Sequence, residues 1–198
     1  ATAACSGITA YSALQKVRYL RSDEFLLIVG AGGVGLAGIG MAKAVVKAKV
    51  IVAELDPAKR AAALEAGADV VLDNSDPFTR EELISLTNGG PNAAIDFVGA
   101  PTTVAFAFDV MAKGASLVLV GLYGGAAQLS TSLFPLKVNN ILGSYVGTQQ
   151  DLIELLQLIR EGKVKTVPMV RRPLKEAPQA IQELREGKAL GRYVLIND

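Results

Sequence analysis

The sequence of 198 residues contains no histidine and a single cysteine, Cys5. Without histidine there is no imidazole to act as a general base, to complete a Ser-His-Asp triad or to bind a metal. A single cysteine cannot form a disulfide within the chain. These absences exclude histidine-based catalysis and a disulfide framework from these 198 residues. On composition alone, Cys5 is more typical of a small buried apolar residue than of a nucleophile or a metal ligand.

The chain also has little net charge and no long apolar run. Its formal net charge is +1, so nothing predicts binding to nucleic acid or to an anionic membrane surface. No stretch of 18 apolar residues is present, which excludes a typical transmembrane helix, and no signal peptide is recognisable. We therefore expect a cytoplasmic protein. Apolar residues make up 51% of the chain, many of them Ala, Val and Leu, as in a parallel sheet buried on both faces.

The most informative motif lies directly after the apolar run Phe25–Val29. It is Gly30-Ala31-Gly32-Gly33-Val34-Gly35, a G-x-G-x-x-G sequence. In a dinucleotide-binding turn the first glycine allows the tight turn, and the second lets the backbone approach a pyrophosphate. The third, here Gly35, lets the following helix pack against the strand. The helix N-terminus then attracts the anion. A strand before the motif and a helix after it strengthen this interpretation.

Strand-like and helix-like segments alternate along the first 146 residues. Strands are expected at residues 25–30, 49–54, 69–72, 93–98, 116–122 and 141–146. Helices are expected between them, at residues 35–48, 57–66, 78–86 and 103–113, while residues 125–140 are loop-like with a short turn near Phe134. Such alternation requires parallel strands with right-handed crossovers. The sequence therefore predicts an α/β fold with a doubly wound six-stranded parallel sheet, a Rossmann fold.

The last fifty residues differ in character. A capping-box-like start at Thr148 precedes a helix at 152–160, followed by an extended piece at 167–170, a helix at 177–185 and a strand at 192–196. We predict a dinucleotide-binding domain over residues 1–147 and a C-terminal segment over residues 148–198. The chain begins at Ala1 without a methionine, within what looks like mid-domain sequence, so we expect it to be part of a longer protein.

Glu54 ends the second predicted strand, 19 residues after Gly35. A carboxylate there accepts hydrogen bonds from the adenosine ribose hydroxyls and repels a 2′-phosphate, which favours NAD over NADP. The alternative is a solvated glutamate. Asp56 competes for this role, but its place before Pro57 is better explained by a helix cap. Lys59, in the first turn of that helix, is within reach of the ribose or simply solvated.

Two loops at carboxyl ends of strands are placed to line a cofactor crevice. They are the segments around Val98 and around Val120 and Leu122. Arg192 is suited to neutralise a pyrophosphate, although a lone arginine near a C-terminus is usually solvated.

In order along the chain, these motifs resemble the zinc-type medium-chain alcohol dehydrogenase superfamily. The segments that support the resemblance span almost the whole sequence: Cys5-Ser6-Gly7-Ile8-Thr9-Ala10-Tyr11, Gly30–Gly35, Glu54-Leu55-Asp56-Pro57-Ala58-Lys59, Val118-Leu119-Val120-Gly121 and Gly191-Arg192-Tyr193-Val194-Leu195.

The resemblance implies specific roles for residues of this chain. Cys5 occupies the position of a ligand to the catalytic zinc, and Thr9 that of a nicotinamide contact. The other implied cofactor contacts are Gly32, Gly33 and Val34 at the pyrophosphate and nicotinamide ribose, Glu54 and Lys59 at the adenosine ribose, the backbone of Val98, Val120, Leu122 and Val146 at the nicotinamide, and Arg192 at the pyrophosphate. Residues 129–146 resemble the segment that pairs two subunits, so a homo-oligomer, a dimer or a tetramer, is expected.

By this resemblance the chain is the NAD(H)-binding portion of a zinc-dependent alcohol dehydrogenase, which transfers hydride between an alcohol or carbonyl substrate and NAD. The family's N-terminal catalytic domain, which holds the other zinc ligands, does not appear in this sequence. Since catalytic zinc needs about three protein ligands and an open position, we expect these residues to bind NAD but not to catalyse alone. One alternative is a zinc-free quinone or enoyl reductase of the same superfamily, against which Cys5 and Glu54 argue. Another is a non-catalytic nucleotide-binding or dimerisation module.

Overall fold

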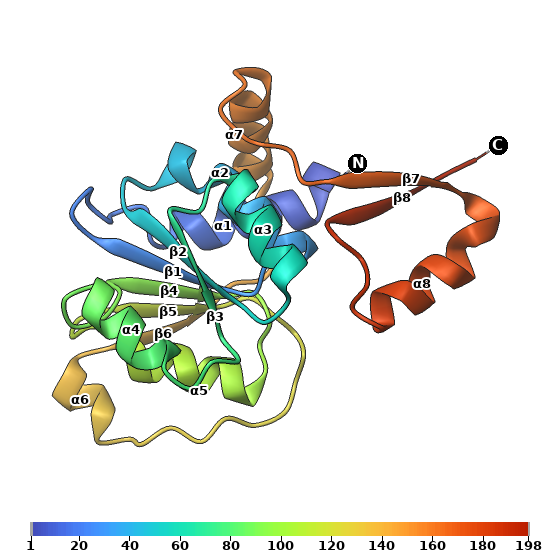
Figure 1. Ribbon diagram of the computed structural model, residues 1–198. Helices are drawn as coiled ribbons and strands as arrows, with labels where there is room; N and C mark the ends of the chain where they lie inside the picture. Colours follow the sequence, from blue (N-terminus) through green and yellow to red (C-terminus); the bar gives the residue numbers. More distant parts are fainter. Residues whose placement is uncertain (1, 198) are drawn as a thin grey trace.

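The computed structural model describes residues 2–197. Its centre is a six-stranded, entirely parallel sheet with strand order β3-β2-β1-β4-β5-β6, as Figure 1 shows. The strands are β1 (Phe25–Val29), β2 (Lys49–Glu54), β3 (Val70–Asp73), β4 (Ala93–Asp96), β5 (Ser116–Leu119) and β6 (Asn140–Gly143). The order reverses between β1 and β4, which creates the crevice where such sheets bind ligands. The predicted doubly wound Rossmann fold is confirmed.

Helices cover both faces of the sheet. One face carries α1 (Ser6–Gln15), α2 (Gly33–Val45), α3 (Pro57–Ala66) and α7 (Gln149–Arg160), and the other carries α4 (Thr79–Leu86) and α5 (Pro101–Val110). Strand β1 contributes side chains to the hydrophobic cores on both faces of the sheet. Leu26 and Ile28 pack under the first group of helices, and Leu27 and Val29 pack under the second. All four side chains are almost completely buried, which explains why β1 is a continuous apolar run.

Helix α3 forms where its sequence predicts. The Asp56 carboxylate accepts hydrogen bonds from the backbone N–H groups of Ala58 (2.7 Å) and Lys59 (3.1 Å), and Pro57 occupies the first helical position. The bond from the Lys59 backbone holds the pKa of Asp56 below its usual value. Gly67, at φ +122°, ends the helix. Asp56 is therefore a helix cap.

A short 3₁₀ turn, η1 (Thr2–Ala4), and helix α1 lie within the first 24 residues, where no element was predicted from the sequence. The Tyr11 hydroxyl of α1 donates to Glu154 of α7 (2.9 Å). Burial, aided by this bond, raises the pKa of Tyr11 to about 12. Leu155 of α7 is buried in the same core as α1 and α2. Helix α7 thus packs against the sheet domain, whereas the boundary at residues 147/148, which remains a prediction, assigns it to the C-terminal segment.

Residues 133–137 form a short helix, α6 (Leu133–Lys137), within the stretch predicted to be loop-like. The Phe134 ring packs against Phe108 of α5 at 4.9 Å between centroids. The Lys137 ammonium donates to the carbonyl of Asp109 (2.8 Å) and so neutralises the carbonyl end of α5. Tertiary contacts with α5, rather than local sequence, account for this helix.

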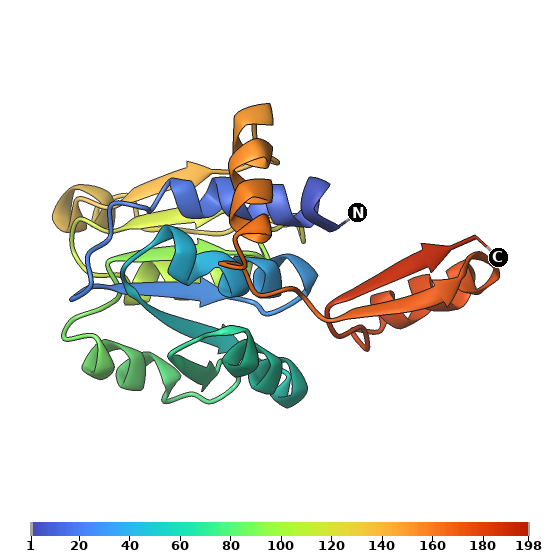
Figure 2. The same ribbon diagram turned by 90° about the horizontal axis from the view of Figure 1, so that it is seen from above.

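The C-terminal residues form a small parallel pair, β7 (Met169–Pro173) and β8 (Arg192–Ile196), joined through η2 (Leu174–Glu176) and α8 (Ala177–Arg185). This unit projects from the sheet domain in both views (Figures 1 and 2). The Glu183 carboxylate holds it together, since it accepts two hydrogen bonds from Arg172 (3.0 and 2.7 Å) and one from the Tyr193 hydroxyl (2.7 Å). Exposed apolar side chains remain on this unit at Met169, Leu174, Ile181, Leu184, Leu195 and Ile196.

Among residues 2–197, no helix is both long enough and apolar enough to cross a membrane.

Candidate functional site

The glycine turn between β1 and α2 is as tight as its sequence predicts. Gly30 has φ +89°, a conformation that side chains strongly disfavour. A Cβ atom on Gly35 would lie 2.0 Å from the carbonyl oxygen of Gly30. The turn therefore brings the start of α2 into backbone contact with the end of β1, and only glycine fits at these two positions.

The two middle glycines face different surroundings. A Cβ on Gly32 would meet nothing within 4 Å, whereas one on Gly33 would lie 2.6 Å from Cδ of Arg192. Within the described residues, no side chain caps the N-terminus of α2, so its first backbone N–H groups are free to bind an anion. Among residues 2–197, the Arg192 guanidinium forms no ion pair. The turn thus combines open space, free N–H groups and a cation, which together fit a pyrophosphate.

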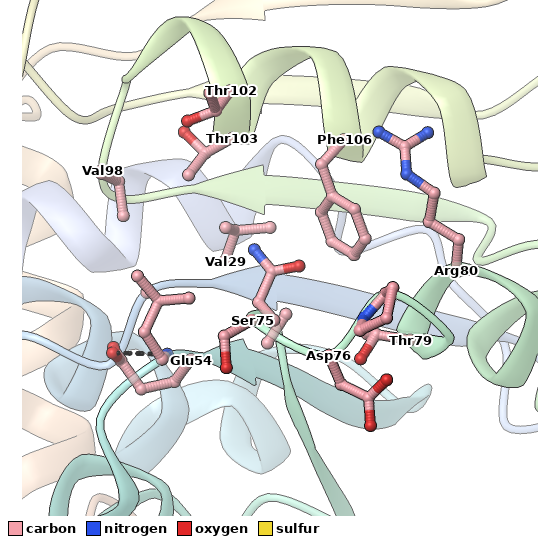
Figure 3. A pocket seen from close by; sticks show the side chains of 15 residues that line it. Val29, Glu54, Ser75, Asp76, Thr79, Arg80, Val98, Thr102, Thr103 and Phe106 are labelled. Carbon is pink, nitrogen blue, oxygen red and sulfur yellow. Dashed lines mark hydrogen bonds between the residues drawn. The ribbon is translucent and has the colours of Figure 1, made fainter.

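A cavity of about 360 Å³ opens on one side of the turn. Glu54 lies on one side of it, and Thr102, Thr103 and Phe106 of α5 lie on the other (Figure 3). The remaining lining residues are Val29, Gly30, Ala53, Leu55, Asn74, Ser75, Asp76, Pro77, Thr79, Arg80 and Val98. We call this the Glu54 cavity.

The Glu54 carboxylate is held by three backbone donors. One oxygen accepts from the N–H of Ala31 (2.7 Å) in the glycine turn, and the other from Leu55 (2.8 Å) and Asp56 (3.0 Å). A carboxylate offers about four acceptor positions, so it still has capacity for a hydroxyl donor. Glu54 therefore links the end of β2 to the glycine turn and presents negative charge to the cavity.

A second cavity, of about 370 Å³, opens on the other side of the turn and is called the Thr9 cavity below. It is lined by Cys5, Thr9, Val34, Phe97, Val120, Gly121, Leu122, Ser144, Tyr145 and Val146. Six of these ten residues were predicted as site residues from the sequence, and the ten together come from five separate segments. Cys5 is exposed, and the Thr9 hydroxyl donates to its carbonyl oxygen (2.8 Å).

Two residues predicted to contact the cofactor, Val98 at the nicotinamide and Lys59 at the adenosine ribose, do not line the cavity expected for them. Val98 lines the Glu54 cavity, while its neighbour Phe97 lines the Thr9 cavity. Lys59 lines neither cavity. Beside it, Arg60 donates to the carbonyls of Glu54 (3.0 Å) and Leu55 (2.6 Å), and so fixes the backbone from which the Glu54 side chain projects.

Asp96, which ends β4 and is fully buried, was not predicted from the sequence. Its carboxylate accepts from the backbone N–H groups of Val98 (2.8 Å) and Gly99 (3.0 Å) and from the Thr103 hydroxyl (2.7 Å). Its carbonyl accepts from Val120 and Gly121, both at 3.0 Å. Because these N–H groups bond to Asp96, β4 and β5 end earlier than predicted. A carboxylate directly at a strand end, followed by a glycine loop, was the available signal.

Residues 2–197 contain no group of three or more His, Cys, Asp or Glu side chains that fits a metal ion. Cys5 alone supplies one thiolate, whereas a catalytic zinc requires about three protein ligands. The described residues do not by themselves form a zinc site.

The parallel sheet and the glycine turn at its switch point define a Rossmann-type α/β fold. Residues 33–161 match the family model described as zinc-binding dehydrogenase, and the chain therefore belongs to that family. It is 36% identical over 195 residues to an NAD-dependent alcohol dehydrogenase of Sulfurisphaera tokodaii and 37% identical over 196 residues to one of Saccharolobus solfataricus. Each alignment covers 97% of this chain and 56% of the relative.

Among solved structures, the chain resembles the alcohol dehydrogenase of the hyperthermophilic archaeon Aeropyrum pernix, with a TM-score of 0.94 and 34% identity. That match covers 99% of this chain and 57% of the other. The chain thus spans little more than half the length of the relatives it matches.

Proposed function

We propose that these residues bind NAD(H) in an extended form along the carboxyl edge of the sheet. The main support is the placement of two cavities on either side of the glycine turn, since Gly30 lines one and Val34 the other. A dinucleotide has this shape, with two nucleoside ends joined by a pyrophosphate. In the proposed orientation, adenosine occupies the Glu54 cavity and nicotinamide occupies the Thr9 cavity.

Each part of the cofactor then meets suitable groups. Glu54 accepts a hydrogen bond from an adenosine ribose hydroxyl at its remaining acceptor position. The first N–H groups of α2 and the Arg192 guanidinium stabilise the pyrophosphate, and the open space at Gly32 admits it. Thr9 and Val146 lie beside the nicotinamide. When bound, NAD supplies the hydride acceptor, and the chain supplies position and electrostatic field.

The Glu54 assignment predicts a cofactor preference. We expect the chain to bind NAD at least about tenfold more tightly than NADP, a difference of ~1.4 kcal/mol, because Glu54 repels a 2′-phosphate. Glu54→Gln removes the charge and is expected to narrow this ratio while weakening NAD binding. Isothermal titration calorimetry with both dinucleotides measures both effects.

Glu65→Gln is the matched control, since Glu65 is an exposed carboxylate on α3 that lines neither cavity. It should leave both affinities unchanged. A wild-type preference for NADP would refute the role of Glu54 and favour the zinc-free reductase alternative.

We further propose that this region acts as the coenzyme-binding part of an alcohol dehydrogenase with alcohol or carbonyl substrates. Two relatives that are 36% and 37% identical are NAD-dependent alcohol dehydrogenases, and this supports the proposal. Cys5, exposed at the Thr9 cavity, is proposed as one zinc ligand in a site completed by residues beyond these 198.

That proposal makes a prediction about metal content. After incubation with zinc and desalting, the 198-residue chain should retain far less than one zinc per chain, because a single thiolate cannot hold the ion. The chain should also fail to oxidise alcohols with NAD. Elemental analysis by mass spectrometry measures the first quantity. One zinc retained per chain, and lost in Cys5→Ser, would contradict this account.

Self-association is proposed through strand β6, which is an edge of the six-stranded sheet and pairs with β5 alone among the strands of residues 2–197. Leu136, Val138 and Leu142 expose apolar surface at or near this edge. These features support the homo-oligomer expected from residues 129–146.

A further inference from the structure

Arg60, near the start of α3, is held from two sides by acceptor groups. Its Nη1 donates to the carbonyl oxygens of Glu54 (3.0 Å) and Leu55 (2.6 Å). Its Nη2 forms an ion pair with the carboxylate of Asp73 (3.0 Å). Because Glu54 ends β2 and Asp73 ends the neighbouring β3, the guanidinium lies between the carboxyl ends of these two strands. Only 21% of the Arg60 side chain is exposed.

The Asp73 carboxylate is itself fixed by its neighbours. One oxygen accepts hydrogen bonds from the N–H (2.9 Å) and the hydroxyl (2.5 Å) of Ser75, and the other oxygen faces Arg60. The bond from the Ser75 hydroxyl holds the pKa of Asp73 below its usual value, so the carboxylate is ionised at neutral pH. The ion pair is therefore held in place from the Asp73 side as well as from the Arg60 side.

The ion pair lies directly behind the wall of the Glu54 cavity. Leu55 lines the cavity on the β2 side and Asn74 lines it on the β3 side, whereas neither Arg60 nor Asp73 lines it. Arg60 bonds to the backbone of Leu55, and Asp73 directly precedes Asn74. Both members of the pair are therefore next to residues that form the wall.

The cavity itself carries more negative than positive charge. The charged side chains that line it are Glu54, Asp76 and Arg80. The Arg80 guanidinium is engaged by the Asp109 carboxylate (2.6 Å). Within residues 2–197, neither Glu54 nor Asp76 forms an ion pair. An additional phosphate in this cavity would therefore need a cation that no carboxylate already engages.

A guanidinium is well suited to bind a phosphate, because its N–H groups form paired, charge-assisted hydrogen bonds with phosphate oxygens. We propose that Asp73 holds the Arg60 guanidinium in an ion pair and thereby withholds it from the 2′-phosphate of NADP. This inference rests on the proposed function, which places the adenosine ribose at Glu54. Glu54 repels the 2′-phosphate directly, and Asp73 engages the cation that would offset this repulsion. Asp73 is thus a positioning residue that strengthens the preference for NAD.

The test releases Arg60 from its carboxylate partner. Asp73→Asn keeps the shape of the side chain and an oxygen for Ser75, but it removes the charge that holds Nη2, so that the guanidinium can turn to a phosphate. We expect the ratio of the NADP dissociation constant to the NAD dissociation constant to fall about fivefold, mainly through tighter binding of NADP. Isothermal titration calorimetry with both dinucleotides measures the ratio, and thermal unfolding checks that the variant is folded.

A double variant assigns the effect to Arg60. When Arg60→Met is added to Asp73→Asn, the cation is absent, so the ratio should return to within about twofold of the wild-type value. Lys59 remains in every variant, so its charge cannot account for a difference between them. Asp69→Asn is the matched control, because Asp69 forms an ion pair with Lys43 next to the opposite end of β3 and its loss changes the net charge equally. It should leave the ratio unchanged.

The outcomes separate this inference from the function on which it rests. If the wild-type chain binds neither dinucleotide, the proposed function itself fails. If it binds NAD, two results overturn the role of Asp73. One is a ratio that Asp73→Asn changes no more than Asp69→Asn does. The other is a gain for NADP that persists in the double variant without Arg60.

Discussion

Gly32→Ala is expected to abolish most NAD binding while leaving the fold intact. Gly32 has φ −69°, which alanine adopts freely, and the added Cβ meets no atom within 4 Å. The folded chain therefore tolerates the change. The methyl group instead occupies the space proposed for the pyrophosphate. We expect a loss of affinity of about 100-fold, or ~2.7 kcal/mol, measured by calorimetric titration with NAD.

Gly35→Ala, in contrast, should destabilise the fold. Its Cβ would lie 2.0 Å from the Gly30 carbonyl oxygen, so β1 and α2 must separate. We expect a loss of unfolding free energy of about 3 kcal/mol or more, measured by urea denaturation. Gly143→Ala, at another glycine with open space, should change neither stability nor NAD affinity. Tight NAD binding by Gly32→Ala would show that the pyrophosphate does not approach this turn.

Asp96→Ala is expected to lower the free energy of unfolding substantially. The substitution leaves the backbone N–H groups of Val98 and Gly99 without their acceptor and removes a partner of Thr103. With about 1–3 kcal/mol for each unsatisfied buried donor, the unfolding free energy should fall by about 3 kcal/mol. NAD affinity should fall as well, because the two loops that Asp96 holds line both cavities.

Asp96→Asn provides a graded comparison. The asparagine oxygen still accepts from Val98 and Gly99, and its amide group can donate to Thr103, so we expect the loss to be about half as large. Asp109→Ala, which breaks an exposed ion pair with Arg80, should cost less than about 1 kcal/mol. Equal denaturation midpoints for Asp96→Ala and Asp109→Ala would refute the structural role of Asp96.

The sheet was predictable because its signals are local and repeat along the chain. Apolar runs such as Phe25–Val29 are typical of central parallel strands, and the glycine turn marks where the first of them ends. Helix α3 was predictable for a similar reason, since Asp56, Pro57 and Gly67 specify its ends locally. In contrast, α6 depends on Phe134 and Lys137 contacting α5, and no local signal marks such a contact.

The candidate site was predictable only in part. The glycine turn and Glu54 follow from strand-end positions, whereas Cys5, Thr9 and Val146 were expected near each other only through the family resemblance. The structure brings these three residues together at one cavity. Asp96 was not predicted because its importance lies in the hydrogen bonds that it makes to Val98, Gly99 and Thr103. These bonds cannot be determined before the chain is folded.

The most direct test of the central claim is a crystal structure of the chain with NAD bound. The account predicts an adenosine ribose hydroxyl on the Glu54 carboxylate, the pyrophosphate over Gly32 beside Arg192, and the nicotinamide beside Thr9 and Val146. A dinucleotide bound in the reverse orientation, or away from the glycine turn, would contradict it.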